Sequence, residues 1–141
     1  MQFEAARWQP RILAVLRIVV ALLFLQHGLQ KVFGFPAPGP AGFAWFSLLG
    51  LAAVIEVIGS LLLLVGLFTR EAAFIMSGFA AAAYFMVHAA SSFYPLVNRG
   101  ELVMLYCFVF LYFVFAGAGA WSLDSRRPGA LPVERPAERR R

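Results

Sequence analysis

Charged residues are scarce in this chain of 141 residues, and their scarcity excludes an ordinary soluble protein. Charged residues make up 13% of the chain and hydrophobic residues 62%, whereas soluble domains carry about 25% charged residues. A water-soluble fold of this size has too little interior to bury so much apolar surface. A lipid bilayer is therefore the expected solvent, and the length leaves no room for a separate soluble catalytic domain.

Cysteine is almost absent as well. The single Cys107 rules out an internal disulfide and a CxxC redox motif. Any redox role therefore needs a cofactor, a bound small molecule or a partner. The net charge of +5 comes mainly from arginines in the two terminal segments. This placement is typical of cytoplasmic tails that face anionic lipid headgroups, and it does not indicate a nucleic-acid partner.

Long apolar runs predict transmembrane helices at residues 11–33, 48–68, 72–90 and 101–121, because about 20 apolar residues cross a bilayer. Backbone groups in lipid must be satisfied internally, so the spans are helical. Short connections then predict an all-α, four-helix up-down bundle over residues 11–124. Residues 1–10 form a short N-terminal segment, and residues 125–141, rich in Pro and Arg, form a basic tail that we expect to be disordered. Because the arginines flank one side of the bundle, both termini are expected in the cytoplasm.

Ionisable residues interrupt the first span, although a purely lipid-facing helix needs none. Arg17, His27 and Lys31 lie within it. His27 lies about 24 Å from the start of its span, and His88 about 25 Å from the start of the third span. We therefore expect the two imidazoles at nearly one depth, in the outer half of the membrane.

Helical spacing strengthens this pattern, because residues four apart share a helix face. His27 and Lys31 are four apart, as are Tyr84 and His88. His27, Lys31 and His88 are expected to form one polar layer with Glu56 of the second span and Glu101 of the fourth. Histidine beside a carboxylate is suited to proton exchange near neutral pH. The candidate catalytic residues are His27, Glu56 and His88, and the candidate ligand-binding residues are Arg17, Lys31, Tyr84 and Glu101.

Structural interpretations of the same residues stay open. Glu56 with Lys31 or Arg17 is also explained as an ion pair that joins helices, and Arg17 as a side chain that reaches the headgroups. The histidines are also explained as packing residues with satisfied hydrogen bonds. Aromatic residues between 106 and 115 suit lipid-facing packing, or alternatively a slot for a flat ring. Two histidines offer ligands to a haem, but the spacing does not indicate a metal site.

Several motifs stand in a characteristic order: FLQHGLQK at 24–31, IEVIG at 55–59, VGLFTREAA at 65–73, AYFMVH at 83–88, NRGEL at 98–102 and WSLD at 121–124. In this order they resemble the DoxX family of small bacterial and archaeal membrane proteins, over about residues 12–124. The resemblance implies a multi-pass protein of the bacterial inner membrane with four helices. The positions that match the family's motifs are Arg17, His27, Lys31, Glu56, His88 and Glu101.

The resemblance also implies redox chemistry, because family members are associated with quinol oxidation, thiosulfate:quinone oxidoreduction and defence against oxidative stress. The expected function is that of a quinone-linked oxidoreductase subunit, with quinone favoured over haem as the ligand. Two alternatives remain: a membrane scaffold that recruits a soluble redox partner, and a small proton-coupled transporter completed by homo-oligomerisation. Whether the chain itself turns over a substrate stays open at this point.

Overall fold

The computed structural model describes residues 5–127, and every regular element in this range is helical, with no strand. The all-α prediction is therefore confirmed. The elements, in chain order, are α1 (Ala5–Phe33), α2 (Leu48–Val65), α3 (Thr69–Ala83) with a π-helical turn (Tyr84–His88) directly after it, α4 (Pro95–Asn98), α5 (Glu101–Ala116) and a 3-10 turn (Asp124–Arg126). Most of the predicted tail, residues 128–141, lies outside the described residues.

Three helical stretches are long and apolar enough to cross a membrane: Ala5–Phe33, Leu48–Val65 and Thr69–His88. Helix α5 is apolar but shorter, with 16 residues. Large apolar side chains point outward on all four long helices; for example, Ile58 is 53% exposed and Phe74 is 67% exposed. Such a surface is costly in water and is expected in lipid, so this is a membrane protein.

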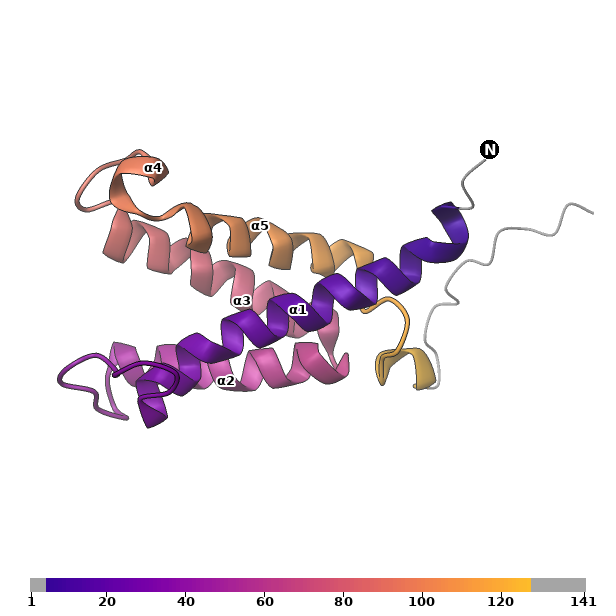
Figure 1. The fold of residues 1–141 in the computed structure, drawn as a ribbon, viewed down its shortest axis with the longest axis horizontal. Helices are drawn as coiled ribbons and strands as arrows, with labels where there is room; N and C mark the ends of the chain where they lie inside the picture. Colours follow the sequence, from indigo (N-terminus) through magenta and orange to yellow (C-terminus); the bar gives the residue numbers. More distant parts are fainter. Residues whose placement is uncertain (1–4, 128–141) are drawn as a thin grey trace, which may run out of the picture.

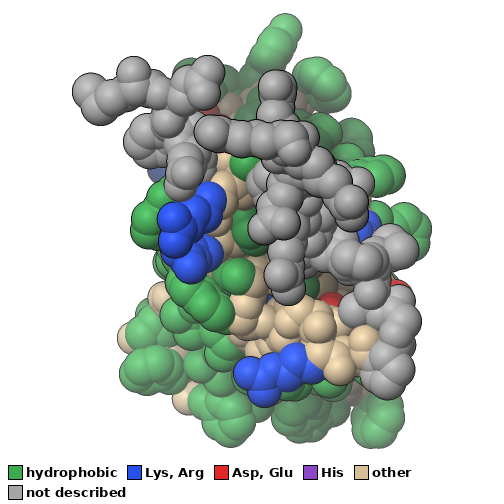
Figure 2. Space-filling view, turned by 90° about the vertical axis from the view of Figure 1, so that its right-hand side faces the viewer, with side chains coloured by type: hydrophobic (Ala, Val, Ile, Leu, Met, Phe, Trp, Pro, Cys, Tyr) green, Lys and Arg blue, Asp and Glu red, His purple; other side chains and the backbone are tan. Residues whose placement is uncertain are grey.

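The long helices pack in neighbouring pairs. Helix α1 lies along α2, α3 lies along α5, and α2 contacts α3. Figure 1 shows the start of α1 and the 3-10 turn at one end of the molecule, here called the terminal end, and residues 34–47 and α4 at the other, the loop end. Viewed from the terminal end, the molecule has hydrophobic side chains around its rim and Lys or Arg side chains on the face turned to the viewer (Figure 2).

The helix boundaries follow local chemistry, and among the differences from the prediction are the start of α1 and the end of α5. Helix α1 begins at Ala5 and contains Pro10, whereas a start near Pro10 was expected. Helix α5 ends at Ala116, and not near residue 121, because Gly117 and Gly119 adopt φ angles of 77° and 70°. A positive φ angle departs from the helical path, and glycine adopts it without steric strain because it has no Cβ. The chain after α5 is therefore free to turn back over the terminal end.

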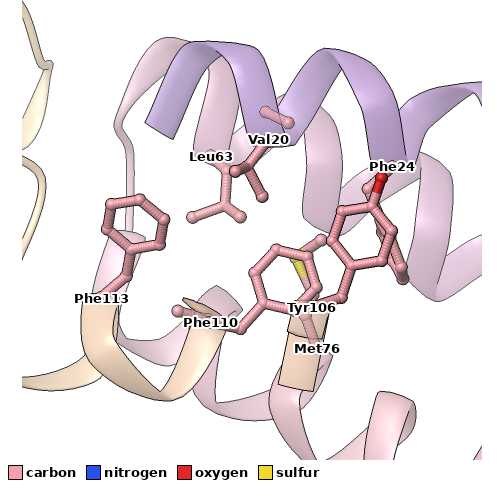
Figure 3. Close-up of a cluster of buried hydrophobic side chains, with 9 residues drawn as sticks. Val20, Phe24, Leu63, Met76, Tyr106, Phe110 and Phe113 are labelled. Carbon is pink, nitrogen blue, oxygen red and sulfur yellow. The ribbon is translucent and has the colours of Figure 1, made fainter. Parts of the chain in front are cut away.

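Buried apolar side chains fill the space between the helices (Figure 3): Val20, Ala21, Phe24, Leu63, Ala73, Met76, Tyr106, Phe110 and Phe113. The aromatic run of α5 thus divides by helical phase. Tyr106, Phe110 and Phe113 face inward and are at most 6% exposed. Phe108 and Phe115 are exposed and match the predicted lipid-facing packing. The prediction of a wholly lipid-facing aromatic run is therefore wrong for the three inward residues.

Candidate functional site

A buried ion pair joins α1 to α2 near the loop end. The Lys31 ammonium nitrogen lies 2.8 and 2.7 Å from the two carboxylate oxygens of Glu56. The side chains of Lys31 and Glu56 are 17% and 6% exposed. Gly28 permits the close approach of the helices, since a Cβ atom there would lie 3.1 Å from the Cβ of Glu56. Of the two basic partners that the sequence offers Glu56, the fold supplies Lys31.

His27 lies one helical turn before Lys31 and is half-buried. Its ring centroid is 6.1 Å from that of Tyr106, with the ring planes at 87°, and 5.9 Å from that of Phe24. The lysine ammonium also lies 3.4 Å from the backbone oxygen of His27. Among residues 5–127, no hydrogen bond engages either ring nitrogen. The imidazole therefore keeps a hydrogen-bond donor and an acceptor available beside the ion pair.

Tyr106 brings a polar group of α5 to the same place, which the sequence interpretation missed. The side chain is 6% exposed, and its hydroxyl oxygen points from α5 toward α1 beside Phe24 (Figure 3). The available signal was the spacing of Tyr106, Phe110 and Phe113, which marks one helix face. Aromatic and large apolar residues also occupy the other faces of α5 in this run, so the sequence pattern did not single out this face. We refer to His27, Lys31 and Glu56 as the ion-pair site, and Tyr106 borders it.

His88 belongs to a separate group at the loop end, here called the loop cluster, with Tyr84 and Asn98. His88 Nδ1 lies 3.1 Å from the backbone oxygen of Asn98, and its ring stacks on Tyr84 with centroids 6.3 Å apart. Because a carbonyl only accepts, Nδ1 carries the proton in this contact and Nε2 is left as the acceptor of a neutral ring. The Asn98 amide donates to the Tyr84 hydroxyl at 3.2 Å and to the Ser92 backbone oxygen at 2.6 Å. These bonds hold the loop against the end of α3.

The residues of the predicted polar layer thus fall into two groups. In the described part of the chain, no hydrogen bond, ion pair or ring contact links the ion-pair site to the loop cluster. Glu101 lies exposed in the first turn of α5 and bonds to neither group. Within residues 5–127, no three His, Cys, Asp or Glu side chains are placed to hold a metal ion. The structure brings together His27, Lys31 and Glu56, and leaves the other candidates apart.

Arg17 lies at the terminal end and is fully buried. Its guanidinium donates to five backbone carbonyls, those of Leu63, Leu64, Ala118, Ala120 and Trp121. A guanidinium has five N–H donors, so these bonds leave none for a ligand. Two of the carbonyls belong to the last turn of α2, where helix carbonyls lack intrahelical partners. Arg17 therefore caps α2 and does not contact the ion-pair site, contrary to its predicted role as a ligand-binding residue.

Residues 117–124, here called the C-terminal strap, supply the other three carbonyls and close the terminal end. The carboxylate of Asp124 accepts the backbone N–H groups of Phe68 and Thr69, each at 2.9 Å, where α3 begins. Burial alone raises the pKa of the Asp124 carboxyl, but these N–H groups and nearby Arg127 outweigh burial and hold the pKa below its ordinary value. The strap is thus tied to the start of α3 by a charged side chain, and to α1 and α2 by Arg17.

Comparison with known proteins places this arrangement in a family. The model of the DoxX family matches residues 12–89, more than half of the chain, including Arg17, the whole ion-pair site and His88. The chain is a member of the DoxX family. This DoxX protein is 50% identical over 125 residues to an uncharacterized protein of Haemophilus influenzae, with 85% of this chain and 93% of the relative covered.

Two further relatives agree with this membership. A second uncharacterized protein of H. influenzae is 30% identical over 135 residues, covering 86% of this chain and 87% of its own. An uncharacterized membrane protein of Mycobacterium tuberculosis is 31% identical over 150 residues, covering 86% and 83%. No solved structure matches the chain. The protein is therefore a DoxX-family membrane protein, and its chemistry has to be argued from the ion-pair site.

Proposed function

We propose that the four long helices cross the bacterial inner membrane as an up-down bundle with both termini in the cytoplasm. The support is the distribution of charge. Lys31 and Arg99 lie toward the loop end, whereas the terminal end carries Arg7, Arg11, Arg70, Arg126 and Arg127, and positive charge favours the cytoplasmic side. A reporter active only in the cytoplasm should work when fused to the C-terminus. Activity of a periplasmic reporter there would contradict this topology.

We propose further that the ion-pair site binds the head group of a quinone, and that the protein is a membrane subunit of a quinone-linked oxidoreductase. The observation that carries this proposal is the half-buried imidazole of His27, which has no hydrogen-bond partner in the described chain although it lies beside a satisfied, buried ion pair. An ion pair that only joined two helices would need no open imidazole next to it. A quinone oxygen can accept from the His27 N–H.

The ion pair suits the chemistry of quinone reduction. Conversion of a quinone to a quinol consumes two electrons and two protons, and negative charge develops on the ring oxygens before protonation. The ammonium of Lys31 lies one turn from His27 and offsets this charge, while Glu56 fixes the position of the ammonium. An imidazole can both donate and accept a proton, which suits the transfer of protons to a quinone oxygen. A single cysteine provides no dithiol in this chain, so the two electrons have to come from a reductant outside it, for which we propose a redox-active partner subunit.

Binding of a short-tail 1,4-benzoquinone to the purified protein in lipid nanodiscs tests this proposal. His27→Ala and Glu56→Gln should each weaken binding by about tenfold, which corresponds to the loss of one or two hydrogen bonds. His88→Ala is the matched control, since His88 belongs to the loop cluster, and it should leave the dissociation constant within about twofold of wild type. Equal affinity in the wild type, His27→Ala and Glu56→Gln would contradict the assignment.

A further inference from the structure

The hydroxyl of Tyr106 is a polar group without a hydrogen-bond partner on a largely buried side chain. The side chain is 6% exposed. Within residues 5–127 no hydrogen bond engages its oxygen, which is not among the fully buried unpartnered atoms of this range, those of Ser60 and Thr69. The other buried tyrosine, Tyr84, both donates to and accepts from neighbours through its hydroxyl. A phenol in the interior of a membrane protein normally finds an acceptor, because no water compensates for a missing bond. The Tyr106 hydroxyl is therefore available to donate to an acceptor that is not part of the chain.

The surroundings specify the shape of that acceptor. The Tyr106 ring meets Phe24 edge-on with centroids 4.9 Å apart, and stacks on Phe110 at 5.8 Å with planes 14° apart. His27 presents its ring at 87° to that of Tyr106, at 6.1 Å. Aromatic surfaces on several sides favour a flat, conjugated ring, which packs edge-to-face or offset against them. The two side chains with unengaged donors, His27 on α1 and Tyr106 on α5, are thus neighbours.

We propose that Tyr106 is the second hydrogen-bond donor of the ion-pair site, so that its hydroxyl and the His27 N–H hold a flat, conjugated ring that carries carbonyl groups, a 1,4-quinone, between α1 and α5. This inference rests on the proposed function and adds a named residue to it. At neutral pH a phenol is a neutral donor, since its ordinary pKa is about 10. Tyr106 therefore binds and orients the carbonyl oxygen and does not act as a base.

The arrangement of the helices gives the ring a route from lipid. Helix α1 packs along α2, and α3 along α5, whereas α1 and α5 meet through aromatic side chains and not through close backbone packing. A ring that enters between α1 and α5 would therefore have to displace side chains and would not have to separate a packed helix pair. An apolar hollow at the start of α2, lined by residues 45–48, 50, 51 and 54, includes neither donor and is a less suitable place for the head group.

Equilibrium binding of a short-tail 1,4-benzoquinone to the full chain in nanodiscs tests the inference with two variants. Tyr106→Phe keeps the ring and removes the hydroxyl, and should raise the dissociation constant about tenfold. Tyr112→Phe is the matched control, because Tyr112 lies on the same helix and is 52% exposed. It should bind as the wild type does. If Tyr106→Phe also binds like the wild type, Tyr106 is not a donor, while the proposed function stands.

A second test changes the ligand and uses only the wild-type protein. The 1,4-dimethoxybenzene with the same tail keeps the flat ring and lacks both carbonyl groups. Wild-type protein should bind the quinone at least about tenfold more tightly than this ether. Equal binding of the two ligands would overturn the donor role of Tyr106. Absence of quinone binding to wild-type protein would overturn the proposed function and, with it, this inference.

Discussion

Replacing Lys31 with methionine leaves the buried carboxylate of Glu56 without a counter-charge. The two side chains are 17% and 6% exposed and bond at 2.8 and 2.7 Å, so solvent screens their interaction only weakly. Breaking a buried ion pair by removing one partner costs about 3–5 kcal/mol, because the remaining charge keeps its desolvation penalty. We therefore expect Lys31→Met and Glu56→Met each to lower the free energy of unfolding by about 3 kcal/mol.

The double variant distinguishes the cost of an orphaned charge from the value of the pair. With methionine at both positions no charge remains buried, and apolar replacements of an ion pair are often neutral or stabilising. The double variant should lie within about 1 kcal/mol of wild type in stability. If it also fails to bind quinone, the pair is present for binding and not for stability.

Denaturant titration in mixed micelles, with the four proteins of the cycle measured side by side, gives these free energies. Gln26→Met serves as the control, because Gln26 is exposed on the same helix, and it should change stability by no more than about 0.5 kcal/mol. Single variants as stable as this control would refute the reasoning, because they would show that neither charge depends on the other.

Three further predictions concern the terminal end. Arg17→Lys keeps the charge but has too few donors for five carbonyls. It should therefore lower the free energy of unfolding by about 2 kcal/mol or more. A variant as stable as the wild type would contradict the capping role. Gly66→Ala places a Cβ 2.5 Å from the Cβ of Ser122, at a residue with a φ of 67°. It should lower the free energy of unfolding by about 1–3 kcal/mol in the same titration. A decrease below about 0.5 kcal/mol would show that the C-terminal strap moves aside without a large loss of contacts. Because the pKa of Asp124 is lowered in the folded protein, its contribution to stability is complete above the ordinary aspartate pKa of about 4 and is lost as the pH falls through the lowered value. Stability curves of wild type and Asp124→Asn should therefore converge in acid, and parallel curves would contradict this linkage.

The sequence alone predicts the helices well, because apolar runs and their interruption by Gly and Pro act locally. It also predicts that Glu56 needs a basic partner, since a lone carboxylate in hydrocarbon is costly. It does not decide between Lys31 and Arg17, which share a face of one helix. That choice follows from the packing of α1 on α2 at Gly28 and from the carbonyls that surround Arg17.

Features that depend on contacts distant in sequence are the ones that the sequence interpretation missed. The C-terminal strap was expected to be the last turn of a helix, and its return over Arg17 depends on positive φ angles at Gly117 and Gly119. Equal depth suggested that His27 and His88 share a layer, but depth along a helix does not determine which neighbour a side chain faces. The inward position of Tyr106 was not recognised because most neighbouring residues of α5 are also large and apolar or aromatic.

The quinone content of protein purified gently from its native membrane tests the role of the ion-pair site most directly. Extraction and chromatography should recover lipid-tailed quinone in near-stoichiometric amounts from the wild type and from His88→Ala, and much less from His27→Ala. Equal recovery from all three proteins, or none from the wild type, would contradict a quinone site at His27, Lys31 and Glu56.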